Sequence, residues 1–176
     1  MIQEIYIPTW KWEVINMDVI TGLCHTRRRH DSIWMIVDKM TKSSYFLAVK
    51  TIVSGEDYAK FYINETARLR EVPFSIISDR GHQFTSYFWK SFRIGLGTEV
   101  KINTTFNPQM DGHVERIIQT LEDMLRFCVI DFKGSWDDDF LLIEFSYNNN
   151  YHSSIQMAPY KALYGVDIDI LLVGLK

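Results

Sequence analysis

Three acidic residues stand at positions where a carboxylate group can do chemistry. Asp18 interrupts the apolar strand pattern of residues 15–20, Asp79 follows the apolar run 74–78, and Glu115 borders the apolar face of a helical pattern. A charge in the middle of a strand is costly to bury unless a partner compensates it. Carboxylates that converge repel one another unless a cation joins them. The first hypothesis is therefore a cation site formed by all three acids.

The cation that suits such a site best is Mg²⁺, which takes oxygen ligands, keeps several waters and completes its shell with substrate phosphates. Two such ions about 3.5–4 Å apart stabilise the attacking and leaving oxygens of a phosphoryl displacement. No convincing serine, cysteine or histidine triad competes with this interpretation. Two simpler roles stay open from the pattern alone: Asp79 as a turn residue before Gly81, and Glu115 as a solvated helix acid.

The order of the predicted elements defines a sheet that can hold these acids. The first three strands are so close in sequence that they must form hairpins, because a parallel crossover needs a dozen or more residues. A helix separates the third strand from the fourth and indicates a parallel crossover there. The result is an α/β domain with a mixed five-stranded sheet covered by helices on both faces. The predicted strands are 12–21, 32–37, 44–49, 74–78 and 99–102, and the predicted helices are 54–72, 85–92, 107–128 and 136–148.

Length and composition fit one domain with a substantial core. The chain has 176 residues, of which 47% are hydrophobic and 14% aromatic. No apolar run approaches the ~20 residues that span a bilayer, and the N-terminus lacks the pattern of a signal peptide. The sequence thus predicts a soluble, intracellular protein with no membrane partner. Cys24 and Cys128 are expected to be reduced and mostly buried.

Charge is distributed unevenly along the chain. The net charge of −3 argues against a dedicated nucleic-acid-binding domain, whose surface is usually basic. Residues 25–30 nevertheless form a basic cluster, which is either a solvated hairpin turn or a phosphate contact, while residues 137–139 are all acidic. Asp38 is interpreted as a turn acid between the second and third strands. Four tryptophans are expected in packing positions rather than as base-stacking platforms: Trp10, Trp12, Trp34 and Trp89.

Several stretches of the chain together resemble a known family. These are residues 7–13 leading into 17–18, 31–38, 41–43, 77–81, 84–86, 106–116, 120–126 and 158–165. They resemble the integrase catalytic core of gypsy-type long-terminal-repeat retrotransposons. The active site of that family is a DDE triad in which 35 residues separate the second Asp from the Glu. Asp79 and Glu115 are likewise separated by 35 residues, which favours the catalytic interpretation of both.

The resemblance implies a fold and an activity. It implies an RNase H-like fold with strand order 3-2-1-4-5, a catalytic core at 10–165, an N-terminal extension at 1–9 and a divergent tail at 166–176. It implies two Mg²⁺ or Mn²⁺ ions held by the triad, 3′-end processing of element DNA, and strand transfer into target DNA. It also implies homo-oligomers and action in the nucleus. Four residues are expected to approach DNA near the active-site edge: Lys101, Asn107, Gln109 and His113.

Departures from the family pattern leave a second hypothesis open. Asn107, Met110 and His113 replace the His, Thr and second Gln that the family usually carries before its catalytic Glu. The zinc-binding domain and the further DNA-binding domain of the family do not occur in these 176 residues. The alternative is therefore a catalytically silent remnant of a retrotransposon polyprotein that contacts nucleic acid or other subunits. A ribonuclease H hydrolase on the same fold is a third, less well supported reading.

Overall fold

The structure is a computed structural model of the whole chain. It describes residues 7–52, 54–67, 72–78, 90–91, 94–102 and 135–166, together with positions 119, 121 and 123. Among these residues, no helix has both the length and the apolar character needed to cross a membrane.

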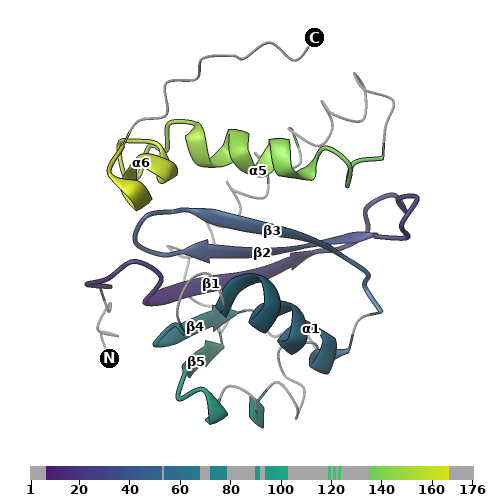
Figure 1. Cartoon of the computed structure of the whole chain (residues 1–176), viewed down its shortest axis with the longest axis horizontal. Helices are drawn as coiled ribbons and strands as arrows, with labels where there is room; N and C mark the ends of the chain where they lie inside the picture. The colour runs from purple at the N-terminus through teal and green to yellow at the C-terminus, as the bar shows by residue number, and fades with distance from the viewer. Residues whose placement is uncertain are drawn as a thin grey trace.

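A mixed sheet of five strands forms the centre of the molecule, in the order β3-β2-β1-β4-β5 (Figure 1). β1 pairs antiparallel with β2, and β2 with β3, whereas β4 runs parallel to both β1 and β5. The predicted mixed sheet, with hairpins first and a parallel crossover after them, is confirmed. The strand bounds are β1 Val14–Ile20, β2 Ser32–Asp38, β3 Ser44–Val49, β4 Ser75–Ser78 and β5 Glu99–Ile102.

The strand β2 is buried on both faces, because all seven of its residues are buried. Side chains of a strand alternate between the two faces of the sheet. Trp34 and Ile36 accordingly belong to one hydrophobic cluster, and Ile33, Met35 and Val37 belong to another. Two layers of helix are therefore needed to cover this sheet, and one lies on each side (Figure 1).

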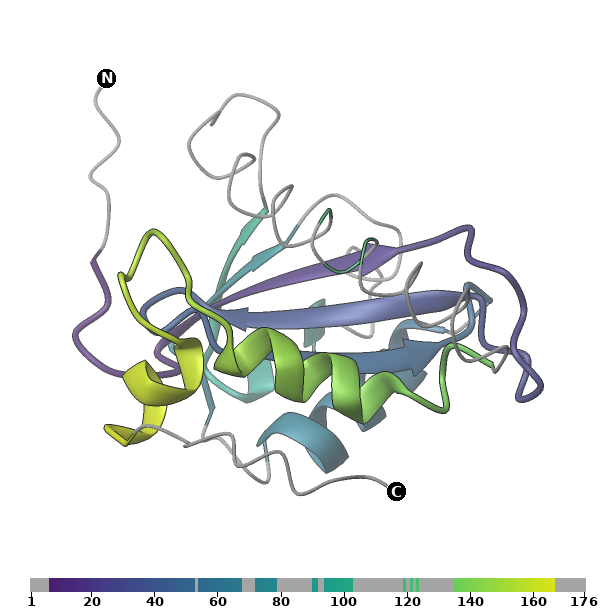
Figure 2. The same ribbon diagram turned by 90° about the horizontal axis from the view of Figure 1, so that it is seen from above.

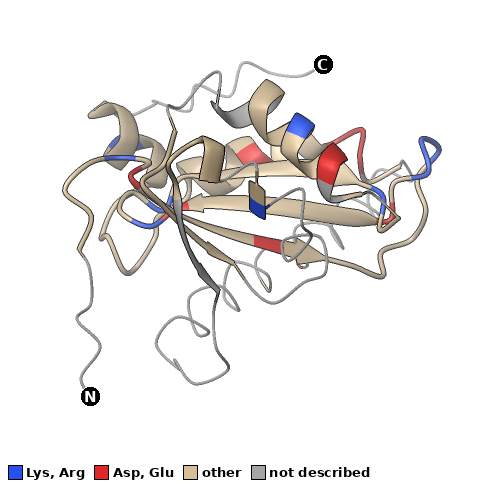
Figure 3. Ribbon diagram, turned by 90° about the horizontal axis from the view of Figure 1, so that it is seen from below, with Lys and Arg blue, Asp and Glu red and all other residues tan. Residues whose placement is uncertain are grey.

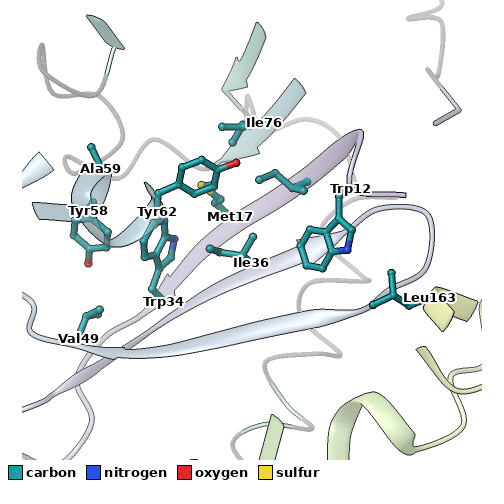
Figure 4. Packing of buried hydrophobic residues seen from close by; sticks show 11 residues of the cluster. Trp12, Met17, Trp34, Ile36, Val49, Tyr58, Ala59, Tyr62, Ile76 and Leu163 are labelled. Atoms are coloured by element: carbon teal, nitrogen blue, oxygen red, sulfur yellow. The ribbon is translucent and has the colours of Figure 1, made fainter. Parts of the chain in front are cut away.

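The helix α1 (Gly55–Phe61) covers the first face. Ser54 caps it: the Ser54 hydroxyl accepts from the Asp57 amide, and the Asp57 carboxylate accepts from the Ser54 amide. Tyr58 packs edge-on against Trp34, with 5.0 Å between ring centroids (Figure 4). Burial, and to a lesser degree the negative charge of Asp31, raises the pKa of Tyr58 to about 12. The helix continues as η1 (Tyr62–Ala67), which lies within the predicted helix 54–72 but has a π-helical winding that the sequence did not predict.

The helix α5 (Phe140–Asn149) covers the second face and runs along β3 (Figure 2). Phe140 and Tyr147 contact Phe46, with ring centroids 6.1 Å and 5.6 Å away. The prediction that this helix starts at Trp136 is wrong, because residues 136–138 form a turn. The Trp136 indole donates to the Cys24 carbonyl at 2.7 Å, and this contact holds the turn against the hairpin that links β1 to β2.

Two polar side chains of α5 satisfy the free backbone edge of β3. The Glu144 carboxylate accepts from the Phe46 amide at 2.9 Å. The Asn148 side chain accepts from the Ser44 amide at 2.9 Å and donates to the Ser44 carbonyl at 2.8 Å. An exposed edge strand is a template for aggregation. The spacing of Glu144 and Asn148, one helical turn apart, thus lets a helix take the place of a sixth strand.

Replacement of Asn148 should measurably destabilise the fold. Asn148→Leu leaves the Ser44 amide and carbonyl without these partners, which costs about 1–3 kcal/mol and lowers the Tm by about 3–10 °C. Thermal unfolding followed by circular dichroism measures the change. Asn149→Leu is the matched control, since the Asn149 amide donates to Phe145 of its own helix. Equal losses in the two variants would contradict an edge-specific role.

Four further expectations differ from the structure or lie outside the described residues. Cys24 is exposed rather than buried, because it lies in the hairpin loop and contributes its carbonyl, not its thiol, to packing. Trp12 and Trp34 are buried as expected, but Trp10 is 70% exposed and packs in no core. Cys128 and Trp89 lie outside the described residues.

A last helix, α6 (Pro159–Tyr164), was not predicted as an element. Pro159 stands at its first position, where proline is favoured, and Gly165 ends it in the left-handed conformation with φ 77°. Its Leu163 belongs to the hydrophobic cluster that contains Trp34 and Ile36, and lies at the same end of that cluster as Trp12 (Figure 4).

Candidate active site

Asp18 lies in β1, the middle strand of the sheet, opposite Met35 of β2. The residue is half-buried, and its carboxylate accepts from the Val19 amide at 2.8 Å. The predicted mid-strand position is therefore confirmed. A charge held this deep among apolar neighbours is costly without compensation, and the five-stranded order puts it between β2 and β4 rather than at an open edge.

The strand β4 runs parallel to β1 and ends at Ser78, one residue before the second acid of the pattern in the sequence. Asn16 pairs with Ile77 and Met17 with Ser78 in the parallel register. Asp18 and Asp79 are the residues that follow Met17 and Ser78 in the sequence. Asp79 itself lies outside the described residues. In this register, the paired residues Met17 and Ser78 are each followed in the sequence by an aspartate.

The face on which Asp18 lies also carries a helical segment. Asp18 and Ile20 share one face because strand side chains alternate, and Ile20 belongs to the cluster that contains Leu121. Leu121 is fully buried, and positions 119, 121 and 123 all have helical backbone conformation. This agrees with the predicted long helix. Glu115 precedes Leu121 by six residues and lies outside the described part of the chain.

Of the remaining predicted site residues, one lies in the described part of the chain and three lie outside it. Lys101 lies in β5 and pairs with Ile77, in the same row of the sheet as Asn16. Asn107, Gln109 and His113 lie outside the described residues. Within the described part of the chain, no group of three or more His, Cys, Asp or Glu residues is placed to hold a metal ion; two of the three predicted ligands are not in that part.

The basic cluster at residues 25–30 is a hairpin turn tied to the acidic segment (Figure 3). Arg28 forms ion pairs with Asp137 at 3.6 Å and Asp138 at 3.2 Å. His30 Nδ1 lies 2.8 Å from the Asp137 carboxylate. One of the three arginines of this turn, Arg28, is therefore paired inside the molecule. The interpretation as a structural turn fits Arg28, while Arg27 and Arg29 are exposed.

Asp137 is the centre of that contact. Burial alone raises the pKa of its carboxyl group, but hydrogen bonds from Ser135, His30 and Thr26 and the charge of Arg28 outweigh it, so the pKa lies below 3.8. A carboxyl group whose pKa is lower in the folded state stabilises the fold above its unfolded pKa. That contribution is lost as the pH falls through the folded pKa.

The pH dependence of stability should follow from this shift. The Tm of the wild-type protein is expected to fall more steeply below about pH 4 than that of Asp137→Asn, which is less stable at pH 7 but has no such proton to take up. Differential scanning calorimetry from pH 3 to pH 7 measures both curves. Parallel curves would show that Asp137 has no such role. Asp138→Asn is the control, since its carboxylate is half exposed.

Asp38 is a structural acid, as predicted. It is fully buried at the end of β2, and its carboxylate accepts from the Trp12 and Thr41 amides at 3.1 Å and 3.0 Å and from the Thr41 hydroxyl at 2.6 Å. These bonds occupy the side chain within the turn between β2 and β3, so Asp38 is no candidate for metal binding.

Solved structures with the same fold come from retroviral integrases. The chain superposes on a chain of the simian T-cell lymphotropic virus intasome in complex with PP2A regulatory subunit B56 gamma. That match has a TM-score of 0.74 and 16% identity, and it covers 92% of this chain and 57% of the other. It also superposes on the HTLV-2 integrase catalytic core domain in complex with magnesium, with a TM-score of 0.68 and 13% identity over 88% of this chain and 97% of the other. The fold is therefore that of an RNase H-like integrase catalytic core.

The sequence comparison narrows this class. The chain is 31% identical over 153 residues to the transposon Tf2-3 polyprotein of Schizosaccharomyces pombe, a match that covers 87% of this chain. No protein-family model matches the sequence. The chain belongs to the integrase cores of long-terminal-repeat retrotransposons. It spans 11% of the length of the polyprotein that it matches.

Proposed function

We propose that this chain is the catalytic core of a gypsy-type retroelement integrase that processes the 3′ ends of element DNA and transfers them into target DNA. The core comprises residues 10–165, with an extension at 1–9 and a divergent tail at 166–176. Its proposed metal-binding and catalytic carboxylates are Asp18, Asp79 and Glu115. The observation that carries the proposal is the β1–β4 register, which sets Met17 beside Ser78, each followed in sequence by an aspartate.

The alternation of side chains supports a single site rather than scattered acids. Asp18 is on the face of the sheet that packs against Leu121. A helix rises about 1.5 Å per residue, so six residues back from Leu121 correspond to about 9 Å along the axis. In the proposed helix, this length suits a Glu115 carboxylate that reaches toward Asp18 and the carboxyl end of β4. The same face and the same end of the sheet would then hold all three acids.

The donor set fits a divalent cation. Three carboxylates offer the oxygen ligands that Mg²⁺ and Mn²⁺ prefer, and the HTLV-2 core domain was solved in complex with magnesium. The chemistry that two bound ions supply is stabilisation of the attacking and leaving oxygens in an in-line phosphoryl displacement. Asp18, in a strand of the central sheet, provides a rigid ligand, since β2 pairs with Asp18 itself and β4 pairs with the preceding Met17.

The two proposed reactions are both phosphoryl transfers. In 3′-end processing, a water oxygen bonds to phosphorus, a phosphodiester P–O bond breaks, and the element strand ends in a free 3′-OH. In strand transfer, that 3′-OH bonds to a target-strand phosphorus and the target 3′ oxygen leaves. The proposed DNA contacts are Lys101, Asn107, Gln109 and His113. Lys101 supports this assignment by its place in the row of Asn16, two residues before Asp18.

An assay with branched DNA tests the proposal. The isolated chain should reverse strand transfer on a branched oligonucleotide in Mn²⁺ and should show no product with EDTA. A reaction without product in Mn²⁺ would favour the catalytically silent remnant. Cleavage of an RNA–DNA hybrid without strand joining would favour a ribonuclease H. We further propose action in the nucleus, where the target DNA is.

The outer face of α5 supports a homo-oligomer. Leu141 is 81% exposed, Leu142 49% and Phe145 45%, so this helix presents apolar side chains away from the sheet as well as toward it. A helix that is apolar all round is usually buried.

The Leu141→Lys variant should therefore sediment as a smaller species than the wild-type protein at equal concentration. Ile52→Lys is the control, because Ile52 is 96% exposed and lies outside this helix. Analytical ultracentrifugation distinguishes the two variants. A wild-type chain that stays monomeric at high concentration would contradict the proposal.

A further inference from the structure

Asn16 is a polar residue in an apolar row of the sheet. It lies in β1, where it pairs with Val37 of β2 on one side and with Ile77 of β4 on the other (Figure 1). Both of these partners are buried. β-Branched and aromatic residues are enriched in strands, whereas asparagine is depleted there. The packing of the sheet therefore gives no reason for an amide at position 16.

The protein does not satisfy the carboxamide of Asn16. Its Oδ1 atom is buried, and among the described residues this atom has no hydrogen-bond partner. A buried acceptor without a partner destabilises a fold, because it has lost its bonds to water. An apolar side chain of similar size would remove the unpaired group without the loss of any bond. Asn16 thus lowers the stability of the central strand, and residues of this kind are expected at functional sites.

Asn16 shares one face of the sheet with Asp18. The two residues are two positions apart, and strand side chains alternate between the faces. A second observation agrees, because Val37 in the row of Asn16 belongs to the same hydrophobic cluster as Ile20. Two residues of strand correspond to about 7 Å. A ligand held at Asp18 would therefore lie within reach of the Asn16 side chain.

The accessible end of the Asn16 carboxamide is a hydrogen-bond donor. The residue as a whole is half-buried, and Oδ1 is its buried, unpaired end, so the NH2 group is the end that a ligand can reach. Phosphate oxygens accept hydrogen bonds, and side-chain amides are among the groups that contact them in DNA complexes. The row of Asn16 continues across Ile77 to Lys101, which is already proposed as a DNA contact.

We propose that Asn16 is a substrate-binding residue of the candidate active site, whose NH2 group donates to a phosphate oxygen of a DNA strand held at Asp18. An amide in an apolar row is then explained by the substrate and not by the fold. The contact leaves the three proposed metal-binding carboxylates in their roles. The inference rests on the proposed function for the choice of DNA.

Two substitutions of the same shape separate the hydrogen bond from the packing of the side chain. Asn16→Val removes the amide and suits a strand, while Asn16→Thr has the shape of valine and keeps a hydroxyl donor. Ser75→Ala is the matched control, because Ser75 Oγ is also buried without a partner in the described part of the chain. Ser75 pairs with Val14, on the same face but two residues further from Asp18.

Fluorescence anisotropy with a labelled branched oligonucleotide measures the affinity of each variant. The buffer contains Ca²⁺, which takes oxygen ligands but with a looser geometry than Mg²⁺. Asn16→Val should bind about 10-fold more weakly than the wild-type chain, as expected for one lost hydrogen bond to a charged group. Its Tm, followed by circular dichroism, should rise by about 2–4 °C, because the unpaired acceptor is gone. Asn16→Thr should lose affinity by only about 3-fold, and Ser75→Ala should bind as the wild-type chain does.

Four results would each overturn the inference. Wild-type affinity in Asn16→Val would show that the amide makes no contact with DNA. Equal weakening in the valine and threonine variants would assign the effect to shape, and equal weakening in Ser75→Ala would assign it to the sheet as a whole. A lower Tm in Asn16→Val would show that the amide is needed by the fold. Weakening that is confined to one of two oligonucleotides of different sequence would assign the contact to a base instead of a phosphate.

The binding result can be distinguished from the outcome for catalysis. If the wild-type chain shows no Mn²⁺-dependent reaction but loses DNA affinity in Asn16→Val alone, the DNA contact stands and the proposed function fails. If the chain is active and Asn16→Val binds DNA as the wild-type chain does, the inference fails alone.

Discussion

Asp79→Asn should abolish Mn²⁺-dependent strand joining on branched DNA, with a rate at least about 1,000-fold below that of the wild-type chain. The amide keeps the shape of the side chain but removes the negative charge that holds a divalent cation. Bound cations contribute several kcal/mol of transition-state stabilisation to phosphoryl transfer, and about 4 kcal/mol corresponds to a factor of 1,000. Quantification of the joined product on a denaturing gel measures the rate.

The same loss is expected for Asp18→Asn and Glu115→Gln, because the three acids are proposed to act as one unit. Asp123→Asn is the matched control. Asp123 is an exposed acidic residue with helical backbone, eight positions beyond Glu115, and its variant should retain activity. Each variant should keep the circular-dichroism spectrum of the wild-type protein. Wild-type activity in Asp79→Asn would remove this residue from the active site, whatever the behaviour of the other two.

Asp38→Ala is expected to have the largest effect on stability. The substitution removes the acceptor for the Trp12 and Thr41 amides and for the Thr41 hydroxyl. Buried donors left without partners cost about 1–3 kcal/mol each, in part relieved by water. We expect a total loss of about 3–5 kcal/mol in the free energy of unfolding and a Tm lower by about 6–20 °C. Urea titration followed by intrinsic fluorescence measures the loss.

Two comparisons separate this effect from a general loss of charge. Asp38→Asn keeps one acceptor oxygen and should lose roughly half as much stability as Asp38→Ala. Asp57→Ala removes a helix cap at the surface, where the Ser54–Asp57 bonds are exposed, and should cost about 1 kcal/mol. If Asp38→Ala were as stable as Asp57→Ala, the turn between β2 and β3 would not depend on its buried acid.

The strands could be predicted from the sequence because they show two recognisable patterns, an unbroken apolar run and an apolar run bounded by polar turns. Residues 32–37 form an unbroken apolar run, and β2 is buried on both faces. Residues 44–49 were bounded by polar turns and form β3 with the same limits. The helices were harder. The start of α5 depends on Asp137, whose contacts with His30 come from the other end of the chain, and no local pattern reports them.

The site was predictable to the extent that its residues break a local rule. Asp18 was found because a charge stood in an apolar strand, and the structure places it in the middle strand of the sheet. The left-handed backbone of Lys42 was not predicted, because nothing in the string of residues 38–42 reports a backbone angle. Trp10 was misjudged for a related reason, since residue type alone favours burial and its turn with Glu13 turns it outward.

A crystal structure of the chain in Mn²⁺, with anomalous data collected at the manganese edge, tests the central claim most directly. The account predicts an anomalous peak bonded to carboxylate oxygens of Asp18, Asp79 and Glu115 at about 2.0–2.3 Å. A peak bonded to other residues, or a Glu115 carboxyl group turned away from the two aspartates, would contradict it.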